Sequence, residues 1–145
     1  MNKLTIGIGV AVIIAIGLFM FGGNPGSTNG NVVSAGEVIE IPLADISSQA
    51  TWHQSQGSKF FVVEASNGDI KVAFDACDVC GGSKGYRQEG EDMICNNCGR
   101  HFAIDELGSK NIYGGGCWPG HLDHTIENGN VVIKTSDISK GSYKF

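Results

Sequence analysis

The sequence predicts a mostly β protein, in which a small antiparallel β domain follows one N-terminal transmembrane helix. Two observations predict the domain. Pairs of short apolar runs flank turn-forming residues that close β-hairpins, and only residues 43–54 have a pattern that suits a short helix. A third observation predicts the transmembrane helix, because residues 4–21 are apolar and contain no formal charge.

The composition excludes several functional classes. The 10 Lys and Arg residues against 15 Asp and Glu residues give a net charge of −5, so no basic surface is expected for a nucleic-acid backbone. A hydrophobic fraction of 41% excludes a wholly disordered chain. Five cysteines are too few for a disulfide-dense scaffold.

Residues 4–21 are the first element of the chain. As a helix this run measures about 27 Å, close to the ~30 Å hydrocarbon core of a bilayer. We therefore assign residues 1–21 to a membrane anchor. A cleaved signal peptide is the alternative, but the small residues 33–35 lie far past the apolar run for a cleavage site.

The flanking charges predict the orientation of this anchor. Lys3 and the amino terminus precede the run, whereas the next Lys or Arg, Lys59, follows several acidic residues. The positive-inside rule then predicts a single-pass protein of the cell membrane with its domain outside the cytoplasm. Residues 22–36, rich in Gly, Asn and Ser, predict a flexible linker, and the extracytoplasmic domain spans residues 37–145.

The first strands of the domain follow from local patterns. Residues 37–42 predict an edge strand, because the run ends at a proline. Residues 59–65 and 70–76 predict a hairpin, whose turn is the Ser-Asn-Gly-Asp sequence of residues 66–69.

Two further turns organise the rest of the domain. Residues 89–92 predict a turn that leads into an apolar pair at 93–94. Residues 124–127 and 131–135 predict a last hairpin around an Asn-Gly-Asn turn.

Four cysteines form two close pairs, Cys77 with Cys80 and Cys95 with Cys98, in the spacing C-x2-C-x14-C-x2-C. Two residues between cysteines let both sulfurs of a tight turn point at one ion. Two such turns at strand ends make a zinc-ribbon-like pocket of four thiolates. The spacing therefore predicts a metal centre, but it does not separate zinc from iron, because thiolates bind both.

Other roles of these cysteines stay open. Each pair is a candidate for a disulfide in an exported domain, although the loop closed within C-x2-C is tiny and strained. One pair is a candidate for thiol–disulfide chemistry, but no helix is predicted after either pair to lower a thiol pKa. Structural zinc without chemistry is a further alternative.

Cys117 follows three glycines and is the fifth candidate. It fits a fifth metal ligand, a thiol beside the ligands, a redox-active thiol or a small buried side chain. Among the histidines, His101 adjoins the second pair and is either a donor to a sulfur or an ordinary strand residue. His121 and His124 suit a second metal site on a helix, which the preceding proline and glycine disfavour, and His53 is expected at the surface.

Three larger side chains near the cysteines are also candidates. Arg87 and Arg100 would offset the negative charge of four thiolates, or lie as ordinary surface cations. Trp118 would cover the centre and exclude water, or belong to the core.

Four motifs around the cysteines resemble the FtrD-like membrane iron–sulfur proteins. They are residues 74–80 (FDACDVC), 85–90 (GYRQEG), 94–102 (ICNNCGRHF) and 115–117 (GGC). The resemblance covers about residues 38–135. It implies a membrane-attached, cysteine-ligated iron–sulfur or metal centre, in a family whose better-known members accompany bacterial ferrous-iron uptake. The larger members have several apolar spans and this chain has one, so a permease-like role is not implied.

Residues 95–102, followed by a glycine run and Pro119, are similar to the second cluster-binding loop of Rieske domains. This similarity implies a Rieske-like β fold with Cys77 and Cys80 in the first loop. Both histidine ligands of a Rieske centre would be cysteines here. The added negative charge lowers the expected reduction potential toward about −400 mV.

These observations predict a membrane-anchored metal- or iron–sulfur-binding protein that transfers electrons or gives redox support to iron uptake, rather than an enzyme. The expected cofactor is an iron–sulfur cluster or a single Zn, Fe or Cu ion. The expected partners are the membrane and a redox or metal-transport protein, with no nucleic acid and no small-molecule substrate. The alternatives are a structural zinc module for docking and a mononuclear iron or copper handling protein. A single ion is easier to load outside the cytoplasm, since no twin-arginine signal precedes the apolar run.

Overall fold

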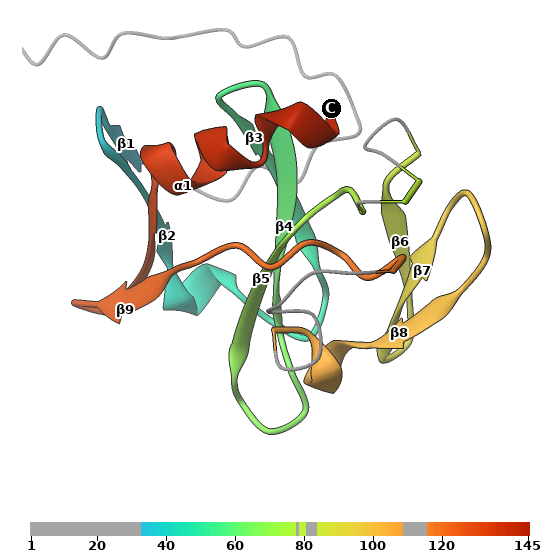
Figure 1. Cartoon of the computed structure of the whole chain (residues 1–145). Coiled ribbons are helices and arrows are strands. Elements are labelled where there is room, and N and C mark those ends of the chain that lie inside the picture. Colours follow the sequence, from blue (N-terminus) through green and yellow to red (C-terminus); the bar gives the residue numbers. More distant parts are fainter. Residues whose placement is uncertain (1–32, 78, 81–83, 109–115) are drawn as a thin grey trace, which may run out of the picture.

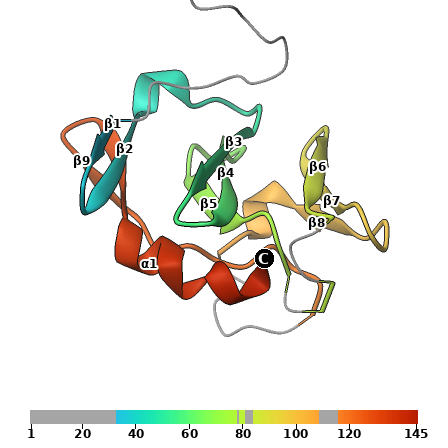
Figure 2. The same cartoon turned by 90° about the horizontal axis from the view of Figure 1, so that it is seen from above.

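The computed structural model describes residues 33–77, 79–80, 84–108 and 116–145. Its strands form three small antiparallel sheets, which confirms the mostly β prediction (Figure 1). Viewed from above, the sheets lie side by side as three layers (Figure 2). The apolar run 4–21 lies outside the described residues, and within them no helix is long and apolar enough to cross a membrane.

The first layer is a four-stranded sheet in the order β1–β2–β10–β9. Its strands are β1 (Val33–Ala35), β2 (Val38–Pro42), β9 (Thr125–Glu127) and β10 (Asn130–Lys134). The last predicted hairpin is confirmed, because β9 and β10 pair in antiparallel register. The edge-strand prediction for residues 37–42 is wrong, since β2 lies between β1 and β10. Pro42 is tolerated there because it stands at the end of the strand.

The middle layer is a three-stranded sheet in the order β3–β4–β5. Its strands are β3 (Thr51–Ser55), β4 (Ser58–Glu64) and β5 (Ile70–Phe74). The strands β4 and β5 are the predicted hairpin around residues 66–69. The helix expected within 43–54 is reduced to the 3-10 turn η1 (Leu43–Asp45), and the second half of that stretch is strand β3.

The third layer is a sheet of three short strands in the order β6–β7–β8. They are β6 (Tyr86–Glu89), β7 (Asp92–Cys95) and β8 (His101–Ala103), followed by the 3-10 turn η2 (Ile104–Glu106). The turn predicted at residues 89–92 is confirmed, because it connects β6 to β7.

A short helix was not predicted at the C-terminal end. Helix α1 (Thr135–Lys140) and the 3-10 turn η3 (Ser142–Lys144) follow β10 directly. The helix has six residues, and its side chain Ile138 is fully buried in the core. A helix this short is stabilised by such packing rather than by its own propensity.

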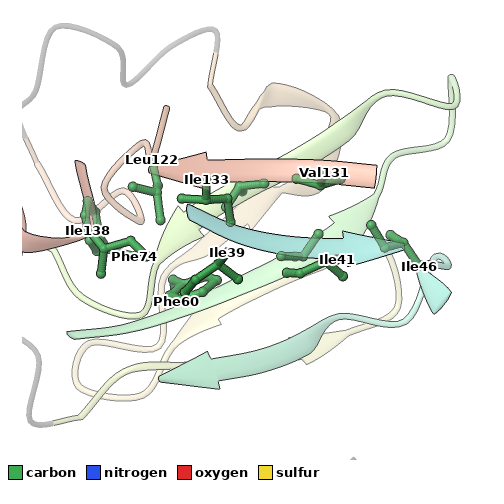
Figure 3. Packing of buried hydrophobic residues seen from close by; sticks show 11 residues of the cluster. Ile39, Ile41, Ile46, Phe60, Phe74, Leu122, Val131, Ile133 and Ile138 are labelled. Carbon is green, nitrogen blue, oxygen red and sulfur yellow. The ribbon is translucent and has the colours of Figure 1, made fainter. Parts of the chain in front are cut away.

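The first core lies between the first and middle layers. Figure 3 shows Ile39, Ile41, Val131 and Ile133 of the first layer facing Phe60 of β4. The cluster comprises Ile39, Ile41, Ile46, Phe60, Val62, Val72, Phe74, Leu122, Val131, Ile133 and Ile138. Every member of the cluster is aliphatic or phenyl, and the fully buried Ser58 of β4 donates its hydroxyl to the Ile138 carbonyl at 3.2 Å.

The second core lies between the middle and third layers. Alternate residues of β4 divide between the two cores, so Phe60 and Val62 belong to the first and Phe61 and Val63 to the second. The second cluster comprises Phe61, Val63, Ala65, Ala73, Cys77, Tyr86, Met93, Cys95, Phe102, Ile104 and Leu107. Two of the predicted metal ligands are thus part of a hydrophobic core.

Candidate metal centre

The two cysteine pairs lie at neighbouring strand ends, beside the second core. Cys77 follows the end of β5, and Cys95 is the last residue of β7. These two side chains are only 1% and 2% exposed. Their pair partners lie farther out, because Cys80 is half-buried and Cys98 is exposed.

A tight turn shapes the second pair. The Cys95 carbonyl accepts the N–H of Gly99 at 2.8 Å, and the Cys95 N–H donates to the carbonyl of Arg100 at 3.0 Å. Gly99 has a φ of 69°, in the left-handed region where a side chain is strained. The glycine after this pair is therefore a requirement of the turn that aims both sulfurs the same way.

Backbone amides surround the first pair. The N–H of Cys80 donates to Cys77 Sγ at 2.9 Å, and the N–H of Val79 also contacts this sulfur. Amide donors of this kind stabilise a thiolate or a metal-bound sulfur. Val79 itself is 67% exposed, so the tip of this loop faces solvent.

The sulfurs of the two pairs meet. Cys95 Sγ lies 3.9 Å from Cys80 Sγ, and the sulfurs of Cys80, Cys95 and Cys98 all lie within 4.8 Å of one another. Thiolates around one tetrahedral ion at a bond length of about 2.3 Å are about 3.8 Å apart. The spacing and the chemistry of these donors fit a soft or borderline ion, and four cysteine thiolates are also the ligand set of iron–sulfur clusters.

Cys117 joins the same group. Its Sγ lies 3.8 Å from Cys80 Sγ, and the sulfurs of Cys77, Cys80 and Cys117 lie within 4.8 Å of one another. The two sets of three sulfurs therefore share Cys80. All five cysteines of the chain converge at one place.

The backbone that carries Cys117 is fixed by hydrogen bonds to the middle sheet. The Gly120 N–H donates to the carbonyl of Ala76 at 3.0 Å, and the Gly120 carbonyl accepts the N–H of Phe74 at 2.7 Å. The Tyr86 hydroxyl donates to the carbonyl of Cys117. These contacts join residues that are more than 30 positions apart, so sequence spacing alone did not reveal them.

Trp118 packs onto the third layer rather than lying over the sulfurs as an isolated cover. Its ring centre lies 4.8 Å from that of Phe102, and the side chain is partly buried against the second core. Trp118 therefore holds the segment that contains Cys117 against β8.

Asp75 is a buried residue beside the candidate site that the sequence did not single out. Its Oδ1 accepts the N–H of Tyr86 at 2.6 Å, which connects the strand before Cys77 to the strand that pairs with Cys95. A Cβ on Gly85 would lie 2.5 Å from Asp75 Oδ2, so only glycine fits there. Burial raises the pKa of Asp75, and this outweighs the lowering by the Tyr86 N–H. The signal was an acid directly after a buried apolar strand.

The thiols differ in how readily they ionise. Burial acts to raise the pKa of Cys77, but the N–H groups of Cys80 and Val79 outweigh it, so the pKa is lowered. The Arg100 N–H and then the Cys95 sulfur lower the pKa of Cys98.

The other two shifted thiols hold their protons more firmly. At Cys80 the Asn97 amide acts to lower the pKa, but the Cys77 sulfur, burial and the other sulfurs raise it to about 12. Burial raises the pKa of Cys117. Metal binding needs deprotonated sulfurs, so an ion that binds here displaces protons less easily from Cys80 and Cys117 than from Cys77 and Cys98.

The candidate charges beside the cysteines point elsewhere. His101 is exposed, and its Nδ1 lies 3.1 Å from Asp92 Oδ2. Arg87 donates to Glu89 at 2.8 Å and Arg100 is exposed. None of these three side chains makes a recorded contact with a sulfur.

The remaining histidines are also away from the sulfurs. The rings of His121 and His124 are 6.3 Å apart, without a third metal-ligating group close to both among the described residues. His53 is half-buried and stacks on Phe60 with ring centres 5.4 Å apart, so its expected surface position is only partly observed.

Comparison with known proteins gives one family. A comparison with curated proteins finds no match. The family model described as membrane iron–sulfur containing protein FtrD-like matches residues 39–145, which include all five cysteines. This match confirms the resemblance seen in the motifs. The chain therefore belongs to the FtrD-like family of membrane iron–sulfur containing proteins.

Proposed function

We propose that this chain is an electron-transfer protein whose centre is held by Cys77, Cys80, Cys95 and Cys98. The observation that carries the proposal is the convergence of two C-x2-C turns, with Cys95 Sγ 3.9 Å from Cys80 Sγ. A four-cysteine iron–sulfur centre supplies one-electron redox chemistry at a low potential, about −400 mV for the plant-type ferredoxins. The family description supports iron and sulfur as its constituents.

Unequal burial gives this centre an inner and an outer side. Cys77 and Cys95 are buried in the second core and exclude water from the inner side. Cys98 is exposed and Cys80 is half-buried, so the outer side reaches solvent. Electrons exchange with a partner through this outer edge, because it is the side that a second protein can approach. No substrate is transformed, so the chain acts as a carrier rather than as an enzyme.

The architecture of the proposed protein follows the same logic. Three antiparallel sheets, with the cysteine turns beside one of them, support a Rieske-like arrangement of two ligand loops. Residues 1–21 anchor the chain in the membrane as a single-pass helix, residues 22–36 are a linker whose end, Val33–Ala35, pairs with β2 as strand β1, and residues 37–145 are an extracytoplasmic domain. The partner is a redox or metal-transport protein of the same membrane, and the role is redox support of iron uptake.

Spectroscopy of the full chain tests the proposed centre. We would purify the protein anaerobically from native membranes, measure its metal and sulfide content, and record visible and electron-paramagnetic spectra. We expect iron with acid-labile sulfide and an absorbance that bleaches on reduction. Cys77→Ser should abolish iron retention. The control variant Thr125→Ser, in the first sheet, should retain iron. A colourless protein with one zinc would contradict the proposal.

A single thiolate-bound ion is the second candidate, and one observation favours it. Cys80 Sγ lies 3.8 Å from Cys117 Sγ and 3.9 Å from Cys95 Sγ, and both distances match the edge of a tetrahedron of sulfurs around one ion. The protein would then handle a mononuclear iron or copper ion, or hold a structural zinc. The same preparation decides, because a single iron ion carries no labile sulfide and zinc gives no visible absorbance.

A further inference from the structure

Five sulfurs converge where a tetrahedral ion or a cluster uses four. We infer that Cys117 is a reserve ligand, so that the centre holds its metal through Cys77, Cys80, Cys95 and either Cys98 or Cys117. The inference rests on the proposed metal centre and adds an exchange of ligands to it.

The distances bring both Cys98 and Cys117 to Cys80, from different sides. Cys98 completes a set of three sulfurs within 4.8 Å with Cys80 and Cys95, and Cys117 completes one with Cys77 and Cys80. The Cys98 sulfur also contacts the sulfurs of Cys95, Cys117 and Cys80. The outgoing and the incoming ligand are therefore neighbours, and one replaces the other by a change of side-chain position.

Cys117 is held at this place by contacts that do not involve the other sulfurs. Gly120 accepts the N–H of Phe74 at the end of β5 and donates to the carbonyl of Ala76 just after it, and the Tyr86 hydroxyl donates to the Cys117 carbonyl. Trp118 packs on Phe102. A cysteine that merely filled core space would not need its main chain fixed from both sides beside four other sulfurs.

Cys117 and Cys98 lie on different sides of the candidate centre, and Tyr86 marks the buried side. The Tyr86 hydroxyl donates to the Cys117 carbonyl, and Tyr86 belongs to the second core together with Cys77 and Cys95. Cys117 is partly buried against this core, so it lies on the protein side of the site. Cys98 is the exposed cysteine of the five. Exchange of Cys98 for Cys117 thus moves the fourth ligand from the solvent side to the protein side.

Replacement of Cys98 by Cys117 as a ligand needs no oxidant or reductant. The Cys117 thiol loses its proton to water and its sulfur bonds to the metal. The bond from the metal to the Cys98 sulfur breaks, and that sulfur takes up a proton. The metal keeps four thiolates and its charge is unchanged. Soft thiolate ligands exchange in this way because each remains a good ligand for the same ion.

A set of serine variants of the full chain in detergent tests the inference. We would compare Cys98→Ser, Cys117→Ser, the double variant and Cys77→Ser. The first measurement is the amount of bound metal. The second, after Co²⁺ substitution, is the thiolate-to-metal absorption, which grows with the number of bound thiolates. We expect Cys98→Ser to keep its metal with the absorption of four thiolates, and the double variant to lose metal at least about tenfold more readily in a chelator competition.

Three results would overturn the inference. One is loss of metal from Cys98→Ser as complete as from Cys77→Ser. Another is metal retention by the double variant equal to that of Cys98→Ser. The third is a fall of the Co²⁺ absorption by about a quarter in Cys98→Ser, which means three thiolates. If the double variant does not fold, as judged by its far-ultraviolet circular dichroism, the absorption of Cys98→Ser alone decides. Absence of metal from the unmodified chain would instead contradict the proposed function.

Discussion

The two cores on either side of the middle sheet share strand β4 but differ in the residues that they contain. Phe60 and Val62 of β4 face a cluster of aliphatic and phenyl groups, whereas Phe61 and Val63 face one that contains Tyr86, Cys77 and Cys95. Both clusters bury apolar surface, but only the second includes residues of the candidate metal centre. The difference shows that the two faces of one sheet can be specialised, one for packing alone and one for packing beside a candidate site.

Neighbouring phenylalanines on β4 give the largest test of this comparison. Phe60→Ala and Phe61→Ala each remove a side chain of 0% exposure, and each should lower the free energy of unfolding by about 3–5 kcal/mol. Only Phe61→Ala should also weaken metal binding, by ~10-fold or more, because Phe61 contacts the Tyr86 ring. Chemical denaturation and chelator competition measure the two effects. Equal weakening by Phe60→Ala would break the division of the two cores.

Removal of the metal should affect the layers unequally. A ligand that binds only the folded state stabilises it by about 3–4 kcal/mol when its free concentration is some hundred to a thousand times its Kd. A chelator should therefore lower the unfolding temperature and speed hydrogen exchange in β6 and β7 more than in β2 and β10. Hydrogen exchange followed by mass spectrometry measures this. Equal loss of protection in both outer sheets would contradict it.

Two glycines with similar backbone give a matched pair of smaller effects. Gly85 and Gly129 have φ angles of 62° and 78°. Gly129→Ala should cost about 1 kcal/mol, because its Cβ meets nothing within 4 Å. Gly85→Ala should cost about 2–3 kcal/mol, because its Cβ would also collide with Asp75. It should weaken metal binding too, since it displaces the Asp75–Tyr86 bond, and thermal unfolding with metal titration measures both.

The smallest effect concerns pH. Burial raises the pKa of Asp75 above its ordinary value of 3.8, so the folded state binds this proton more tightly than the unfolded state. The contribution of Asp75 to stability is therefore fully present below pH 3.8 and is lost as the pH rises through the raised pKa. Asp75→Asn should remove this loss and flatten the decline of stability with rising pH.

Asp105 is the control, because its pKa is shifted in the opposite direction to that of Asp75. The Ser66 hydroxyl and N–H lower the pKa of Asp105, so its contribution is present above pH 3.8 and is lost as the pH falls. Asp105→Asn should therefore lower stability at neutral pH and leave it unchanged in acid. Unfolding curves across pH 3–7 compare the two variants, and slopes of the same sign would refute the assignment.

Local chemistry made part of the fold predictable. The turns around residues 66–69 and 128–130 contain Gly with Asn, and each connects the two strands that were predicted beside it. The predicted turn at 89–92 connects β7 to β6, a strand that was not predicted. Strand β3 and helix α1 were not predicted either, because their state depends on partners distant in the sequence. Thr51–Ser55 pairs with β4, and Ile138 fills a space between two sheets.

The candidate site was likewise predictable only in part. The spacing of the four paired cysteines predicted that their sulfurs lie together, because each C-x2-C turn is a local structure. The approach of Cys117 depends on Gly120 bonding to the strand that precedes Cys77, and the role of Asp75 depends on Tyr86. Contacts of that kind arise only when the whole chain has folded.

The order of the layers also fixes the direction of access. The sheet that contains β1 and the sheet of β6, β7 and β8 lie on opposite sides of the middle sheet (Figure 2). Cys77 and Cys95 belong to the core between the middle and third layers. Stacked sheets are about 10 Å apart, so these sulfurs lie on the order of 10–20 Å from the sheet that contains β1. A partner that reaches the exposed Cys98 therefore approaches the domain from the side away from that sheet.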